Sequence, residues 1–144
     1  MSWYNDIDTT KKVRLGTRKR DIAGNEYIYL KGVGSTVAED FVVFDEAFAT
    51  TRAIADEVGP VAVAMSACDA TTEFGWYGIY GNFTGDTATV AADKALYLTA
   101  TAGRLDDADV AGDSVHGAFS MAADSSNSCS VFLNYPWVSD IAHD

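Results

Sequence analysis

The stretch FGWYGIYG, residues 74–81, places four aromatic side chains and three glycines in eight positions. Strand alternation divides the rings between two faces, with Phe74, Trp76 and Tyr80 on one and Tyr77 on the other. A neighbouring ring can fill the space above each glycine, and glycine also permits bulges and tight curvature. We therefore expect a strand packed on both faces, with at most one face offered to a partner, rather than a catalytic platform.

The sequence on either side of this stretch predicts further short strands. Apolar runs such as EYIYL (26–30) and VAVAM (61–65) recur about every 8–12 residues, with Gly, Asp and Asn between them. We expect NFTGDT (82–87) to be a turn and ATVAAD (88–93) to be a strand. Alanine, valine and threonine are frequent and leucine is scarce, which favours strands over packed helices. The predicted fold class is all-β: a single compact β-sandwich or small barrel of about eight short antiparallel strands.

Charge is divided unevenly along the chain, whose net charge is −11. Residues 1–20 hold six of the ten Lys and Arg residues and only two acids, whereas residues 53–144 hold two basic residues and thirteen acids. We therefore expect an extended basic N-terminal arm over residues 1–25 and an acidic all-β domain over residues 26–144. Phosphate backbones would repel so acidic a body, so nucleic acid is not an expected partner of the domain.

Neither a membrane nor the secretory route is expected from the sequence. It contains no apolar run of about 18 residues, the length that a membrane-spanning helix needs. The first residues lack the charged and apolar regions of a signal peptide. Cys68 and Cys129 fit no metal-binding spacing and lie in apolar segments. We expect them to be reduced thiols that pack as small hydrophobic residues, and a single bridge between them is left open.

The residues that could catalyse a reaction or bind a metal form no convincing motif. His116 lies within a predicted strand, and His143 lies one residue from the C-terminus. Asp107 and Asp109 resemble part of a calcium loop, but Gly112 is misplaced for such a loop and the closing glutamate is missing. Aspartate is also common in turns because its side chain caps backbone N–H groups. We expect no enzyme, no metal site and no cofactor.

Four segments, in this order, resemble the small head decoration (cement) proteins of tailed bacteriophages. They are GPVAVAMSA (59–67), FGWYGIYG (74–81), ATAGRLDDADVAGDSVHGAF (100–119) and VFLNYPWV (131–138). The resemblance covers roughly residues 58–138. Some members of that family are shorter and have no basic leader.

The resemblance implies a structural virion protein without enzymatic activity, made in the host cytoplasm and bound to the outer surface of the assembled capsid. Its implied partner is the phage major capsid protein, whose subunit contacts it would reinforce; binding to further copies of itself is left open. The basic arm would lie along acidic grooves of the capsid, anchored by its aromatic residues. The implied capsid contacts are Trp3, Tyr4, Lys11, Lys12, Arg14, Arg18, Lys19 and Arg20. The candidates for aromatic packing or a partner strand are Phe74, Trp76, Tyr77 and Tyr80.

A second hypothesis is a carbohydrate- or receptor-binding β-domain of a phage tail or fibre. In that case the aromatic residues of 74–80 or 135–137 would stack on sugars. The run Asn134–Trp137 at the end of the last predicted strand has two interpretations, core packing or an exposed contact patch.

Overall fold

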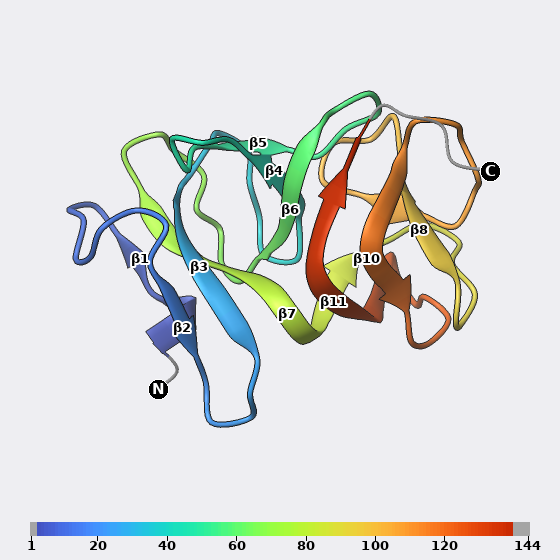
Figure 1. Cartoon of the computed structure of the whole chain (residues 1–144), viewed down its shortest axis with the longest axis horizontal. Helices are drawn as coiled ribbons and strands as arrows, with labels where there is room; N and C mark the ends of the chain where they lie inside the picture. Colours follow the sequence, from blue (N-terminus) through green and yellow to red (C-terminus); the bar gives the residue numbers. More distant parts are fainter. Residues whose placement is uncertain (1–2, 140–144) are drawn as a thin grey trace.

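Eleven strands form one antiparallel sheet that curves back on itself into a sandwich-like body without closing into a barrel (Figure 1). The computed structural model describes residues 3–139; within them the only helical element is the 3₁₀ turn η1, Trp3–Asn5. The strands are β1 Ile7–Asp8, β2 Arg18–Arg20, β3 Glu26–Lys31, β4 Phe41–Phe44, β5 Thr50–Arg52, β6 Gly59–Ala64, β7 Phe74–Asp86, β8 Ala95–Leu98, β9 Leu105–Asp106, β10 Ser114–Ser120 and β11 Ser128–Val138.

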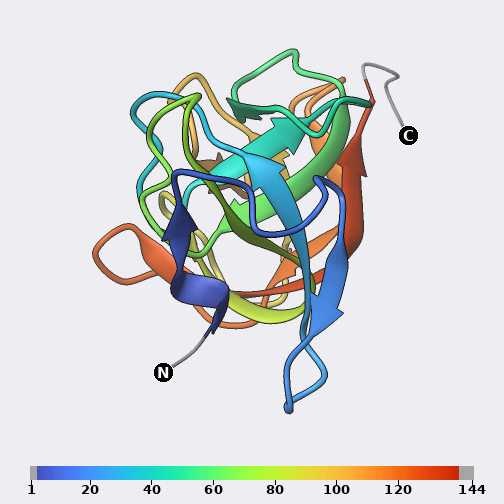
Figure 2. The same cartoon turned by 90° about the vertical axis from the view of Figure 1, so that its left-hand side faces the viewer.

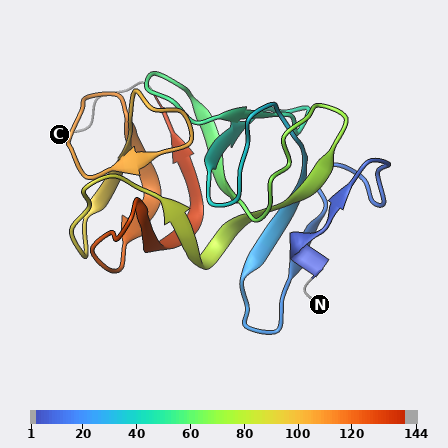
Figure 3. The ribbon, with the colours of Figure 1, turned by 180° about the vertical axis from the view of Figure 1, so that it is seen from behind.

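Strand β7 joins the two halves of the molecule. The main strand order is β2-β3-β7-β6-β11-β10-β8-β9; in addition, β1 pairs with β7, and β4 pairs with β5 and β6. The first half of β7 pairs with β1, β3 and β6, and its second half pairs with β11 over residues 80–86. In Figure 1 this strand runs from the side of β1–β6 toward the side of β8–β11, and the same bent course is visible from behind in Figure 3.

Two hydrophobic cores lie on opposite faces of β7. Trp76 packs against the larger core, which contains Phe83 and side chains of β8–β11, while Tyr77 and Ile79 belong to a second core with residues of β3, β4 and β6. The edge of the Phe83 ring lies over Gly78, where a side chain would collide with it. The prediction that FGWYGIYG packs on both faces, with a ring above a glycine, is therefore confirmed.

Three details of the predicted strand pattern are wrong. The sheet has eleven strands, not about eight, and NFTGDT is no turn, because β7 continues through it beside β11. Gly85, within that stretch, leaves room for the Phe41 ring. Residues 88–93 form no strand, because the side chains of Asp124 and Asp107 accept hydrogen bonds from three of their backbone N–H groups.

The N-terminal segment expected as an extended arm lies on the sheet. β1 pairs with β7 through Ile7 and Gly75, and β2 pairs with β3 through Arg18 and Ile28. In Figure 2 these blue elements lie against β3 and β7. Residue 25, the expected boundary, falls in the β2–β3 hairpin, and the N-terminal segment contributes two short strands, β1 and β2, to the sheet. The expected domain end at residue 144, and His143, lie outside the described residues.

Both cysteines are free thiols buried in different cores, Cys68 in the core around Tyr77 and Cys129 in the larger one. Burial raises the pKa of Cys68 to about 11 and also raises the pKa of Cys129. Both thiols are thus protonated at neutral pH and pack as small apolar groups. Over residues 3–139, no helix has the length and apolar character needed to span a membrane.

Candidate partner-binding surface

An unbroken row of aromatic side chains crosses the outer surface of β10, β11 and β7 and ends at two arginines of β2. Successive ring centroids are 5.5, 5.7 and 5.3 Å apart. The guanidinium groups lie 5.6 and 5.8 Å from the last two ring centroids. We call this surface the aromatic–arginine face; along it lie Phe119, Phe132, Tyr80, Tyr135, Arg20 and Arg18.

Strand pairing places these residues side by side although they are far apart in the sequence. Phe119 on β10 pairs with Phe132 on β11, and Tyr80 on β7 pairs with Asn134 on β11. Tyr135 has a φ of 47°, in the left-handed region that a bulky residue seldom occupies. The pairing of β10 with β11 shifts register here, between His116 and Ala118, so Tyr135 lies in a bulge of β11.

A nearly buried carboxylate fixes the arginine end of the face. Glu26 on β3 is only 7% exposed, and it accepts a 2.8 Å hydrogen bond from the Tyr135 hydroxyl. It also forms ion pairs with Arg20 at 3.0 Å and with Arg18 at 3.8 Å. Since these groups are already held in place, a partner would bind here with a small loss of side-chain entropy.

The aromatic–arginine face is open to solvent. Phe119 is 43% exposed and Tyr135 is 40% exposed. Next to them Trp137, 46% exposed, lies against His116 with a ring distance of 4.2 Å. Core packing therefore does not describe Tyr135 and Trp137, whose side chains are exposed. Tyrosine, tryptophan and arginine are the residues most enriched at the energetic centres of protein interfaces.

The aromatic residues expected to anchor an arm pack within the molecule. Tyr4 stacks on Tyr27 at 4.8 Å, and the Trp3 ring meets Trp76 edge to face at 5.0 Å. Both residues pack against the larger core. In this conformation Trp3 and Tyr4 attach the N-terminal segment to its own sheet.

The cations expected to contact a capsid are dispersed. Lys12 forms a 3.2 Å ion pair with Asp8, and Lys11 lies 6.0 Å from the Phe74 ring. Lys19 lies over the Trp3 ring at 4.3 Å, and the Arg14 carbonyl accepts hydrogen bonds from Thr17. Among the expected contact and partner-strand residues, Arg18, Arg20 and Tyr80 belong to the aromatic–arginine face.

Phe119 and Phe132 are not among the site residues expected from the sequence. Each lies at an outward position of a strand whose neighbouring positions are buried, as with Val131 and Leu133 on either side of Phe132. Alternation along VFLNYPWV marks Phe132 as facing away from Val131 and Leu133, which is the signal that could have identified it.

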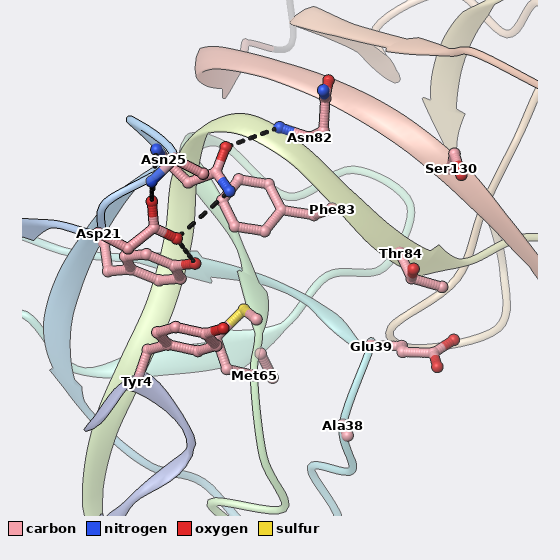
Figure 4. A pocket seen from close by; sticks show the side chains of 13 residues that line it. Tyr4, Asp21, Asn25, Ala38, Glu39, Met65, Asn82, Phe83, Thr84 and Ser130 are labelled. Carbon is pink, nitrogen blue, oxygen red and sulfur yellow. Dashed lines mark hydrogen bonds between the residues drawn. The ribbon is translucent and has the colours of Figure 1, made fainter. Parts of the chain in front are cut away.

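A hollow of about 550 Å³ lies between the N-terminal segment and β7, shown in Figure 4. One group of its polar residues is bonded together: Asp21 accepts hydrogen bonds from the Tyr27 hydroxyl at 2.7 Å and from Asn25, whose Oδ1 accepts one from Asn82 N–H. Burial opposes ionisation of Asp21, but these hydrogen bonds outweigh it and lower the pKa of that carboxyl. The polar lining of the hollow thus attaches the β2–β3 hairpin to β7.

Aspartate side chains of the acidic loop, residues 106–113, accept hydrogen bonds from backbone N–H groups of other segments. Asp107 accepts a hydrogen bond from Ala91 N–H, and Asp113 accepts one from Asp56 N–H. No group of three or more His, Cys, Asp or Glu side chains within residues 3–139 is arranged to hold a metal ion. Asp106 makes the local turn bond, accepting from Ala108 N–H, whereas the bonds of Asp107 and Asp113 hold distant segments of the chain against the loop.

The buried tyrosines predict a loss of stability at alkaline pH. Burial raises the pKa of Tyr29 to about 12, and its hydrogen bond to Asp8 acts in the same direction. Burial also raises the pKa values of Tyr27 and Tyr77. Because unfolded tyrosine titrates near pH 10, this stabilisation is complete below about pH 10 and is lost as the pH rises toward 12. Urea unfolding at stepped pH is expected to show that the free energy of unfolding falls above about pH 10. A constant free energy of unfolding there would contradict the raised pKa values of these tyrosines.

Comparison with protein-family models, with curated proteins and with solved structures found no match. The fold and the surface define the chain as an all-β domain with an exposed aromatic–arginine face. The domain is built on a curved antiparallel sheet.

Proposed function

We propose that this chain is a structural protein of a tailed-phage virion, which binds the outer surface of the assembled capsid and reinforces contacts between major capsid protein subunits. The proposal rests on the aromatic–arginine face, with the sequence resemblance to decoration proteins supplying the identity of the partner. A row of half-exposed rings ending in two arginines has the composition of a protein interface. In this role the chain adheres and performs no reaction.

The charge distribution gives the proposed complex an orientation. Residues 53–144 carry thirteen acids against two basic residues, whereas β2 consists of Arg18, Lys19 and Arg20. An acidic region of the capsid surface would attract the β2 side and repel the rest of the domain. The acidic bulk of the domain would then face solvent.

The test is sedimentation of the purified chain with capsids that lack it. Tyr135→Ala and Phe119→Ala each remove an exposed ring from the face, and we expect each to weaken capsid binding at least tenfold. Tyr135→Phe keeps the ring and loses only the hydroxyl bond to Glu26, so it should bind more tightly than Tyr135→Ala.

The matched control is Val110→Ala, which shortens a 47% exposed side chain in the loop between β9 and β10, a loop that contributes no residue to the face. It is expected to bind like the unaltered chain. Equal binding by all four variants would contradict the role of the face, and failure of the unaltered chain to sediment with capsids would contradict the proposed function.

A carbohydrate-binding domain of a tail or fibre is the second candidate. The observation in its favour is the exposure of Tyr135 and Trp137, since flat exposed rings stack on sugars as well as on proteins. A glycan array separates the two: binding of a defined glycan that Trp137→Ala abolishes would favour this candidate over the capsid.

A further inference from the structure

Strand β2 is an open edge of the sheet. Within the described part of the chain it pairs with β3 and with no other strand, and Arg18, Lys19 and Arg20 are all exposed. An unpaired edge presents a row of backbone N–H and C=O groups that can pair with a further strand. What this edge offers depends on which backbone groups point outward.

The hydrogen-bond pattern identifies those groups. The flanking residues Thr17 and Asp21 bond through their backbones to the chain on the β3 side. In an antiparallel ladder the bonded positions alternate, so Lys19 also directs its N–H and C=O toward β3. The backbone groups of Arg18 and Arg20 therefore point away from the sheet.

Charged side chains on an edge strand often serve to prevent pairing, but here they lie over the two faces of the sheet. Arg18 and Arg20 lie on the face that carries Glu26, whereas Lys19 lies on the opposite face, over Trp3. Each cation is beside a ring: Arg18 by Tyr135 at 5.8 Å, Arg20 by Tyr80 at 5.6 Å and Lys19 by Trp3 at 4.3 Å. This placement leaves the backbone edge between the side chains clear.

Charge determines what the edge attracts. Three cations stand on β2 and one carboxylate, Glu26, pairs with two of them, in a chain of net charge −11. A segment with carboxylates at successive positions would meet Arg18 and Arg20 on one face and Lys19 on the other. The rest of this acidic chain would repel the same segment, which confines it to β2.

We propose that the edge of β2 binds an extended acidic segment of a partner protein as an added β-strand. The backbone groups of Arg18 and Arg20 hydrogen-bond to the incoming strand, and the three cations select for acidic side chains. This role does not depend on which protein supplies the segment; it uses the backbone edge of β2, whose Arg18 and Arg20 side chains also end the aromatic–arginine face.

Hydrogen exchange of individual amides tests the proposal on the full chain. The probe is a short synthetic peptide with glutamate at three successive central positions and valine on either side, and the control peptide has lysine in place of glutamate. We expect the glutamate peptide to slow exchange of the Arg18 and Arg20 amides at least tenfold, while the Lys19 amide, already bonded to β3, changes little. The lysine peptide should have no effect, and added salt should weaken the protection.

A backbone variant separates strand addition from charge attraction. Arg18→Gln removes a cation and keeps the N–H, whereas Arg18→Pro removes both and spares the bonds to β3, because proline is tolerated where the N–H faces solvent. We expect Arg18→Pro to bind the glutamate peptide about fivefold more weakly than Arg18→Gln, the effect of one lost hydrogen bond. Circular dichroism checks that both variants keep the fold.

Three results would overturn the proposal. One is the absence of binding by the glutamate peptide, and another is binding without protection of the Arg18 and Arg20 amides. The third is protection that rises with protein concentration when no peptide is present, which would assign the edge to a second copy of the chain. Because the hydrogen-exchange experiment uses the unaltered chain, it tests strand addition even if Arg18→Pro does not fold.

Discussion

Arg52→Met is expected to lower the free energy of unfolding by about 3–5 kcal/mol, because it leaves a buried carboxylate without its charge partner. Asp40 is completely buried, and its Oδ2 accepts a 2.9 Å hydrogen bond from Arg52 Nε and a 3.1 Å bond from Val37 N–H. The other oxygen, Oδ1, has no hydrogen-bond partner among the described residues. Loss of the Arg52 guanidinium therefore leaves the buried Asp40 charge with a single hydrogen bond within residues 3–139, from Val37 N–H.

Urea unfolding at pH 7 measures the effect, and Arg104→Met is the matched control. The N···O distance of the Arg104–Asp86 pair is 3.0 Å, against 2.9 Å for Arg52–Asp40, but the Asp86 side chain is 20% exposed and keeps contact with water. Arg104→Met should therefore lower the free energy of unfolding by clearly less than Arg52→Met. Asp40→Asn in the Arg52→Met background removes the buried charge and should recover part of the stability. Equal losses for Arg52→Met and Arg104→Met would contradict this account.

Gly78→Ala is expected to cost up to about 3 kcal/mol, although it adds a single methyl group. A Cβ at Gly78 would lie 2.5 Å from two carbons of the Phe83 ring. The backbone cannot move away, because Gly78 is paired with Tyr27 on β3 and with Val63 on β6. The ring is also confined, since Phe83 is 7% exposed and lies 5.6 Å from the Tyr27 ring.

A double-mutant cycle tests the cause of this loss. Phe83→Leu frees space above Gly78, so Gly78→Ala should cost less in that background than in the unaltered chain. Gly75→Ala is the control on the same strand, since its Cβ would meet the end of the Ile7 side chain at 3.3 Å, which can shift. Equal costs of Gly78→Ala with phenylalanine and with leucine at position 83 would exclude the ring as the cause.

The N-terminal segment shows where charge and sequence position mislead. Six basic residues near the start predict an extended arm, yet the segment carries short strands and two rings that pack on the sheet. β1 and β2 have two and three residues, too few for an alternation pattern to be recognised. Their pairing with β7 and β3 depends on partners that lie far along the chain.

The sequence alone determined the β character of the chain and the two-faced packing of FGWYGIYG. Both follow from the alternation of side chains along a strand and from the room that glycine leaves, which are local properties. Alternation also assigns Phe132 and its buried neighbours to opposite faces.

Only the tertiary structure decided which of those faces is covered. The aromatic–arginine face joins residues from β2, β7, β10 and β11, which are far apart in the sequence and adjacent in the sheet. A strand reveals two faces, but the long-range pairing of the sheet determines which one meets the core and which one meets solvent. Tyr77 and Tyr135 are both tyrosines on strands, and the sheet buries the first and exposes the second.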